Sequence, residues 1–148
     1  MAMKIIGVLG SPRGQLSQTT KLAKAFAEGA EAEGAEVELV DLCRLKIEYC
    51  TACEVCHRTG RCVHQDDLVP LRKKLMKADG LLFASPDYFR TVTAQMKTLI
   101  DRMSDVIHCQ LFQGKYACRL ATSGGPASEE VIADRNGVLL SLGTSVVG

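Results

Sequence analysis

The chain has 148 residues, a length at which one hydrophobic core buries on the order of 68–70% of the unfolded surface, so we expect a single domain spanning residues 1–148. Its 18 basic and 17 acidic side chains nearly balance, and no apolar run approaches the ~20 residues of a membrane span, which argues against nucleic acid and membrane as partners. The seven cysteines are odd in number and residues 1–10 lack the apolar stretch of a signal peptide, so we expect a cytoplasmic protein whose thiols stay reduced.

The N-terminal third alternates a strand, a helix and a second strand. Residues 4–9 form a short, continuous apolar run, which is typical of a strand buried on both faces. Residues 19–33 carry apolar side chains at helical spacing, and Gly34 supplies the expected stop. Residues 37–42 form the second predicted strand.

A cysteine-rich loop at about residues 49–65 interrupts this alternation. Asp67 is predicted to cap the next helix, with Pro70 in the first turn. Lys77 lies near the predicted end of that helix, where a cation suits the helix dipole. Residues 81–84 form the third predicted strand.

The remaining segments continue the pattern. A long amphipathic helix is predicted from Thr93, with Asp101 and Arg102 on its solvated side or in an assembly contact. Its apolar stripe consists of Met96, Leu99, Ile100, Met103, Val106 and Ile107. A strand, a helix and a strand follow at residues 116–122, 128–142 and 144–147. Strands separated by helices pair in parallel through right-handed crossovers, so we expect an α/β fold, a three-layer open sheet with helices on both faces.

Four cysteines lie close together in the pattern C-x2-C-x2-C-x5-C, at Cys50, Cys53, Cys56 and Cys62. This spacing favours a polynuclear iron-sulfur cluster, because bridging sulfides spread the iron atoms and give each thiolate its own iron. A zinc ion more often takes two separated C-x2-C pairs. Two alternatives stay open, a structural zinc ion and a loop of free thiols. The other cysteines, at positions 43, 109 and 118, are interpreted as packing thiols, and the three histidines as loop or surface residues.

In an open parallel sheet the ligand crevice lies beyond the carboxyl ends of the strands. The loop after the first strand has hydroxyl groups and a cation before a helix N-terminus, which suits a terminal phosphate. These residues are Ser11, Arg13, Ser17, Thr19 and Thr20. The loop has neither a Walker motif nor a G-x-G-x-x-G fingerprint, and the alternative is that its hydroxyls only cap the helix.

Two further loops follow the third and fourth strands. The first contains Ser85, Pro86, Tyr88 and Phe89, whose aromatic rings offer flat apolar faces for a planar ring. The second contains Thr122, Ser123 and Gly124, in a glycine-containing turn that lets the backbone approach a ring edge. The three loops in combination are more specific than any one of them.

Taken together, the motifs Gly10-Ser-Pro-Arg, Ser17-x-Thr-Thr20 and Ser85-Pro-Asp-Tyr-Phe and the cysteine run resemble the iron-sulfur flavoprotein branch of the NADPH-dependent FMN reductase family. The resemblance implies a flavodoxin-like sheet of order 2-1-3-4-5, noncovalently bound FMN and a 4Fe-4S cluster on the four cysteines. It implies that the first loop holds the flavin phosphate, that the second flanks the isoalloxazine and that the third lies at its other edge. It also implies a homodimer or homotetramer.

The chain departs from the family pattern in two respects. Tyr49 and Ala52 stand where the family often has Pro and Gly beside the first two cysteines. The sequence stops at Gly148 as the fifth strand begins, whereas relatives usually continue, so we expect the last helix of the fold to be absent.

These observations predict an FMN-dependent electron-transfer oxidoreductase in which FMN handles two electrons and the cluster one, with no acid or base residue required. The expected partners are NAD(P)H or a redox carrier protein such as ferredoxin. One alternative is an NAD(P)H-dependent FMN or quinone reductase without a cluster. Another is a flavodoxin-like binding module with a structural zinc loop.

Overall fold

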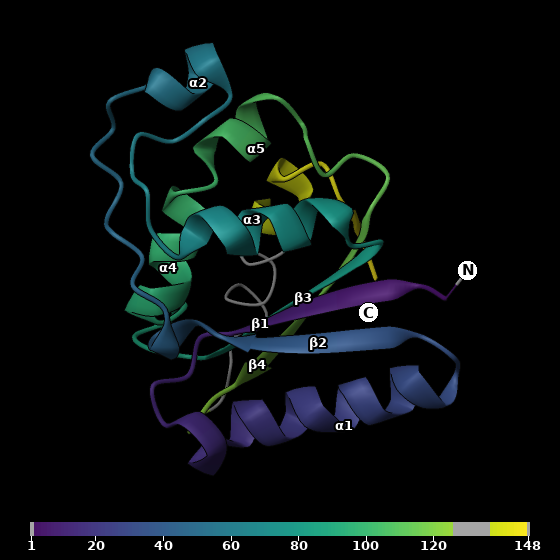
Figure 1. Cartoon of the computed structure of the whole chain (residues 1–148). Helices are drawn as coiled ribbons and strands as arrows, with labels where there is room; N and C mark the ends of the chain where they lie inside the picture. The colour runs from purple at the N-terminus through teal and green to yellow at the C-terminus, as the bar shows by residue number, and fades with distance from the viewer. Residues whose placement is uncertain (1, 126–136, 148) are drawn as a thin grey trace.

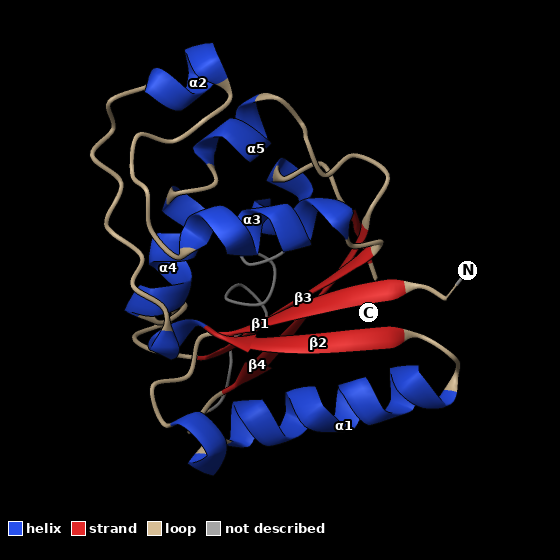
Figure 2. Ribbon diagram, in the orientation of Figure 1, coloured by secondary structure: helices blue, strands red, loops and turns tan. Residues whose placement is uncertain are grey.

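The structure is a computed structural model that describes residues 2–125 and 137–147. Its centre is a five-stranded parallel sheet of order β2-β1-β3-β4-β5, which confirms the predicted topology. The strands are β1 (Lys4–Leu9), β2 (Glu36–Asp41), β3 (Gly80–Pro86), β4 (Tyr116–Thr122) and β5 (Ser145–Val146). Figure 2 shows helices on both faces of this sheet, as expected for the three-layer fold.

Helix α1 (Gln18–Ala32) covers one face of the sheet. The opposite face carries α3 (Leu68–Lys77), α4 (Ala94–Asp101) and α5 (Ser104–His108), and the short helix α2 (Val55–Thr59) stands beyond α5 (Figure 1). Two single 3-10 turns, η1 (Gly14–Leu16) and η2 (Leu42–Arg44), follow β1 and β2. Of the helix predicted over residues 128–142, residues 137–141 are helical and 128–136 lie outside the described residues.

The hydrophobic core has one layer on each face of the sheet. The α3, α4 and α5 side is the larger, and its fully buried members include Val8, Leu75, Leu81, Met96, Leu99, Met103 and Phe112. The α1 side contains Leu9, Ala23, Leu82 and Ala84. Both β1 and β3 contribute to the two layers, because successive side chains of a strand point to opposite faces. The continuous apolar runs of these two strands thus reflect their central position.

The long helix predicted from Thr93 is wrong in one respect, since it is divided into α4 and α5. Arg102 ends α4, and Met103 has φ −96° and ψ 25°, outside the helical region. The apolar stripe itself is confirmed, because Met96, Leu99, Met103 and Val106 are all buried. The apolar residues keep their helical spacing from α4 into α5, so the sequence pattern does not reveal the break between the two helices.

Of the two predicted placements of Arg102, the one on the solvated side of the helix is wrong. Its side chain is 1% exposed and forms an ion pair with Asp66. Asp101 is exposed as expected and pairs with Lys97 one helical turn earlier. Arg102 is therefore buried and the adjacent Asp101 exposed, a difference that the helical spacing of the sequence does not reveal.

Two smaller expectations need correction. Asp67 stands at the N-cap of α3 but makes no side-chain capping bond, since its Oδ2 accepts from the backbone N–H of Lys46 at 2.7 Å. Cys43 and Cys109 are exposed and are not packing thiols, whereas Cys118 is half-buried against the α1-side core.

Within residues 2–125 and 137–147, none of the helices has the length and apolar character that crossing a membrane would require.

Candidate functional site

The loops after β1, β3 and β4 meet at the carboxyl edge of the sheet, where backbone and hydroxyl groups join them. The N–H of Gly10 donates to the Ala84 carbonyl at 2.8 Å, and Thr93 Oγ1 donates to the Gly10 carbonyl at 2.6 Å. The N–H of Asp87 donates to the Thr122 carbonyl at 2.7 Å. The sequence prediction that these three loops converge is therefore confirmed by their direct contacts.

The hydroxyl groups of the first loop gather around the N-terminus of α1. Ser11, Ser17, Thr19 and Thr20 are between 1% and 4% exposed. Ser17 is the N-cap of α1, and its Oγ accepts from the Thr20 N–H at 3.3 Å, so the capping role considered for this loop holds for Ser17. Arg13 is exposed. A helix N-terminus with hydroxyl groups around it matches the requirements of a phosphate group.

The loop after β3 separates buried from exposed residues. Ser85 is buried, and its hydroxyl donates to the Pro86 carbonyl at 2.9 Å while accepting from the Thr93 N–H at 3.1 Å. Tyr88 is 43% exposed and Phe89 is fully exposed. The two aromatic side chains therefore lie at the surface of the loop, where they can contact a bound ligand or a second protein chain.

A tight turn fixes the position of these aromatic residues. Tyr88 and Thr91 pair through both of their backbone bonds, at 2.9 and 3.0 Å. Between them, Phe89 and Arg90 have φ values of 50° and 65°, the left-handed region that favours Asn and Gly in such turns. A bulky residue held there stores backbone strain, which functional loops often contain.

The loop after β4 is more open. Thr122 is half-buried and shares a hydrogen bond of 2.6 Å with Thr19, whereas Ser123 and Gly124 are exposed. Sequence reasoning missed Thr93 as a member of the site. This threonine is fully buried and ties the first and second loops together, but its sequence signal is only that of a helix N-cap.

The four cysteines of the spaced motif line one cavity of about 200 Å³, together with residues that include His64 and Arg102. Cys50 and Cys53 are exposed, and Cys56 and Cys62 are half-buried. The structure thus brings all four predicted metal ligands to the wall of one cavity. In the parts of the chain that the structure describes, no three His, Cys, Asp or Glu side chains are placed to hold a single metal ion.

The thiols of this cavity differ in acidity. The backbone N–H of Val55 is the main cause that lowers the pKa of Cys53, since a hydrogen bond to sulfur favours the thiolate. Burial raises the pKa of Cys56, with the negative charges of Asp105 and Cys62 as further causes. Cys53 is therefore the more readily ionised of the two, and a thiolate is the form that binds metal.

Contacts with α5 hold the helix that follows the first cysteines. His57 in α2 shares a hydrogen bond of 2.6 Å between its Nε2 and Ser104 Oγ. Its ring stacks on that of His108, with centroids 4.6 Å apart and planes at 14°. The two histidines lie at the surface, as predicted, and their structural contribution is to attach α2 to α5.

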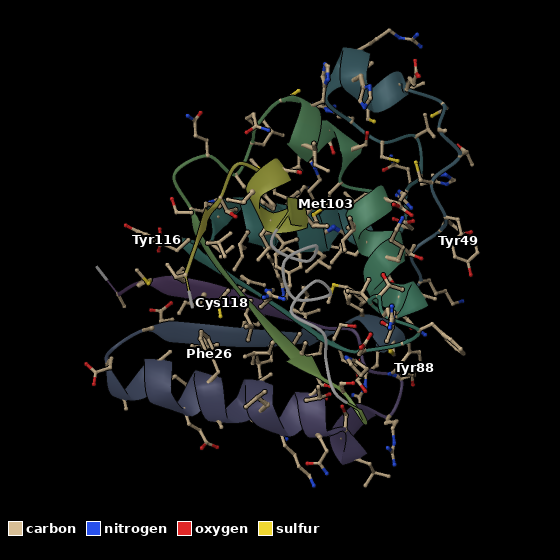
Figure 3. All side chains as sticks on the ribbon, turned by 180° about the vertical axis from the view of Figure 1, so that it is seen from behind. Phe26, Tyr49, Tyr88, Met103, Tyr116 and Cys118 are labelled. Atoms are coloured by element: carbon tan, nitrogen blue, oxygen red, sulfur yellow. The ribbon has the colours of Figure 1, made fainter. Side chains whose placement is uncertain are left out.

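The cysteine loop and the three convergent loops lie at the same end of the molecule. In Figure 3, Tyr49 and Tyr88 are both at the end opposite Tyr116, the residue that begins β4. Helix α4 joins the two places, since Thr93 at its N-cap bonds to the first loop and Arg102 at its C-cap bonds to the cysteine loop. Its eight residues correspond to an axial length of about 12 Å.

Residues 3–148 match the family of NADPH-dependent FMN reductases. The chain is 40% identical over 147 residues to an iron-sulfur flavoprotein from Archaeoglobus fulgidus, covering 99% of this chain and 66% of that protein. It is 33% identical over 139 residues to an iron-sulfur flavoprotein from Methanocaldococcus jannaschii, covering 91% and 64%. The chain spans 51% to 66% of the length of such curated relatives.

Solved structures share the fold of this chain. An NADH:FMN oxidoreductase in its apo form superposes with a TM-score of 0.74 at 26% identity, covering 99% of this chain and 72% of that one. An NAD(P)H:quinone oxidoreductase from Methanothermobacter marburgensis gives a TM-score of 0.76 at 18% identity, covering 100% and 85%, which shows the shared fold. The family match, the relatives and the sheet order together establish that the chain belongs to the NADPH-dependent FMN reductase family, in its iron-sulfur flavoprotein branch.

Proposed function

We propose that this chain binds FMN at the three convergent loops and a 4Fe-4S cluster at the four motif cysteines, and that it is an electron-transfer oxidoreductase. The observation that carries the proposal is that Cys50, Cys53, Cys56 and Cys62 line one cavity at the end of the molecule where buried hydroxyls surround a helix N-terminus. The names of the curated relatives support the same combination of groups.

The residues of the first loop fit the flavin phosphate. Ser11, Thr19 and Thr20 bring hydroxyl groups to the N-terminus of α1, where the helix dipole stabilises negative charge. Ser17 keeps the first turn of the helix in place as its cap, and Arg13 at the surface supplies a cation near the loop.

The isoalloxazine ring is assigned to the loops after β3 and β4. Tyr88 and Phe89 would contact a ring face, and Ser85 with Pro86 would fix the start of that loop. At the other edge, Thr122, Ser123 and Gly124 offer hydroxyl and backbone groups. When bound, FMN supplies two-electron chemistry and the cluster one-electron chemistry, while the chain sets their potentials through hydrogen bonds and burial.

The four-cysteine cavity fits a cluster because its walls contain four thiols and it is wide enough to hold more than one atom. Arg102, a cation at the cavity wall, would partly balance the negative charge of the four thiolates when a cluster is bound. NAD(P)H or a carrier protein such as ferredoxin is the proposed electron partner, and a homodimer or homotetramer is the proposed assembly.

Anaerobic reconstitution with FMN, iron and sulfide tests the proposal. We expect bound FMN together with iron and acid-labile sulfide in a cluster ratio, and loss of iron and sulfide in Cys53→Ser with FMN retained. Cys109→Ser removes an exposed thiol outside the motif and serves as the matched control. Zinc in place of iron would support the zinc loop, and bound FMN with rapid NADPH turnover but no metal would support a plain reductase. Either result would overturn the cluster assignment.

A further inference from the structure

The two ends of the cysteine loop are paired with each other. The Lys46 N–H donates to Asp67 Oδ2 at 2.7 Å, and the Asp67 N–H donates back to the Lys46 carbonyl at 3.2 Å. The Glu48 N–H donates to Asp66 Oδ2 at 2.9 Å. The loop therefore leaves and returns at one point, and residues 49–65 are closed off by these bonds.

Arg102 lies at this closure and joins both ends. Its Nη1 donates to the Glu48 carbonyl at 2.6 Å and to Asp66 Oδ2 at 2.7 Å, and its Nη2 donates to Asp66 Oδ1 at 3.2 Å. The side chains of Arg102 and Asp66 are 1% and 8% exposed. A buried charge pair with this fork-like geometry is strongly directional, and removal of either partner leaves a buried charge uncompensated.

Arg102 also lies close to the last motif cysteine, Cys62. Arg102 and Cys62 together line the cysteine cavity and also the neighbouring cavity beside α3. Burial alone would lower the pKa of Arg102, but the hydrogen bonds and charges of Asp66 and Cys62 outweigh it, so the pKa is raised. Among the described residues, the Nε of Arg102 is buried without a hydrogen-bond partner, while both Nη atoms are bonded.

We propose that Arg102 is a positioning residue that closes the cysteine loop through Glu48 and Asp66 and places its positive charge at the wall of the cavity that Cys62 also lines. The inference rests on the proposed cluster for its electronic consequence, but the closure of the loop stands without it. A positive charge beside a cluster ligand stabilises the more negative, reduced form, and net charge and hydrogen bonds to sulfur are known determinants of cluster potentials. Arg102 would therefore raise the reduction potential of a cluster bound in this cavity.

Three variants separate the two parts of this role. Arg102→Gln removes the charge, Arg102→Lys keeps the charge without the planar fork, and Lys97→Gln removes an exposed charge from the same helix as a matched control. The first measurement is amide hydrogen exchange over residues 46–67 in the metal-free chain. The second is a redox titration of the reconstituted protein, followed by the visible absorption of the cluster.

We expect Arg102→Gln and Arg102→Lys to speed exchange over residues 46–67 at least about tenfold, since both lose the bidentate contact with Asp66. We expect Arg102→Gln alone to lower the equilibrium constant for reduction about tenfold, which is about 59 mV for a one-electron step. Lys97→Gln should change neither. Unchanged exchange in both Arg102 variants would overturn the closure, and a potential in Arg102→Gln equal to that of the unaltered chain would overturn the electrostatic role.

The two proposals fail in different ways. If the unaltered chain takes up no iron and sulfide, the proposed function is wrong, while the exchange measurement still decides whether Arg102 closes the loop. If Arg102→Gln does not fold, Arg102→Lys and Asp66→Asn supply the exchange comparison, and Arg102→Lys supplies the potential, which should stay near that of the unaltered chain because the charge is retained.

Discussion

Thr19 and Thr122 share a hydrogen bond of 2.6 Å between their Oγ1 atoms, although 103 positions separate them in the chain. The contact joins the first turn of α1 to the end of β4 and directs two hydroxyl groups to the N-terminus of the helix. It directly links the loop proposed for the flavin phosphate to the loop proposed for the far edge of the ring.

Replacing Thr19 by Val should weaken FMN binding. A lost hydrogen bond to a charged phosphate costs about 1.5–3 kcal/mol, which corresponds to a Kd on the order of 10- to 100-fold higher. Fluorescence titration with FMN measures the change. Thr19→Ser should retain most of the affinity. Thr98→Val removes a buried hydroxyl in α4 that donates to the Ala94 carbonyl of the same helix, and this variant should retain the affinity fully. Equal affinities for all three variants would remove Thr19 from the phosphate site.

Gly10 permits the close approach of the first loop to the start of α4. A Cβ at this position would lie 2.9 Å from Thr93 Oγ1 and 3.0 Å from Met96 Cβ. Gly10→Ala should therefore displace Thr93 and destabilise the chain by about 1–3 kcal/mol in urea unfolding. Gly29→Ala in α1 meets no atom within 4 Å and should be neutral or stabilising by up to about 1 kcal/mol. A neutral Gly10→Ala would show that the loop and α4 are not in fixed contact.

The ion pair of Asp66 with Arg102 should make stability depend on pH in the acid range. Burial alone would raise the pKa of Asp66, but the hydrogen bonds and charge of Arg102 and the N–H groups of Glu48 and Leu68 outweigh it and lower the pKa. A carboxyl whose pKa is lower in the folded state stabilises fully above its unfolded pKa of about 3.9, and this contribution is lost as pH falls through the folded value.

Asp66→Asn provides the comparison for this effect. At neutral pH the variant should be less stable by about 3–5 kcal/mol, because Arg102 is left buried without its counter-charge. The difference in unfolding free energy from the unaltered chain should narrow below about pH 4, where the Asp66 carboxyl of the unfolded chain begins to take up a proton, and should continue to narrow as pH falls through the lower folded pKa. A difference that stays constant down to pH 2 would contradict the assigned direction of the pKa shift.

Phe89 is expected to combine a cost in stability with a benefit in binding. Its φ of 50° is unfavourable for a bulky side chain, so Phe89→Asn should raise the stability of the FMN-free chain by about 1 kcal/mol in thermal unfolding. The same change should weaken FMN binding if the exposed ring contacts the flavin. Arg90→Gly, which relieves the neighbouring left-handed residue, should stabilise without a change in affinity. Tighter FMN binding by Phe89→Asn would exclude Phe89 as a ring contact.

The sequence predicted the sheet well because its signals are local. The apolar runs of β1 and β3 and the alternation of elements follow directly from burial and chain connectivity, and the order of strands matches. The division between α4 and α5 could not be predicted, because Met103 and Val106 continue the apolar stripe of the preceding helix. Periodicity reports which face is buried and is insensitive to one non-helical residue.

In the candidate site too, short sequence patterns could be recognised, whereas contacts between distant positions could not. The three loops and the four cysteines were predicted from residue type, spacing and the family resemblance. The burial of Arg102 was not, because it depends on Asp66, which is 36 positions away and lies beyond the cysteine loop. Thr93 was likewise expected only to begin a helix, since its bond to Gly10 spans 83 positions.

Helix α4 also fixes the distance between the two proposed redox sites. One end is attached to the loop after β1 and the other to the closure of the cysteine loop. Inserting one residue into α4 would turn the attachment at its C-cap by about 100° relative to that at its N-cap. Inserting four residues, about one turn, would lengthen the helix by about 6 Å and turn the attachment by only about 40°. The length of a single short helix thus sets the separation of the two proposed cofactor sites, and with it the distance of the electron transfer proposed between them.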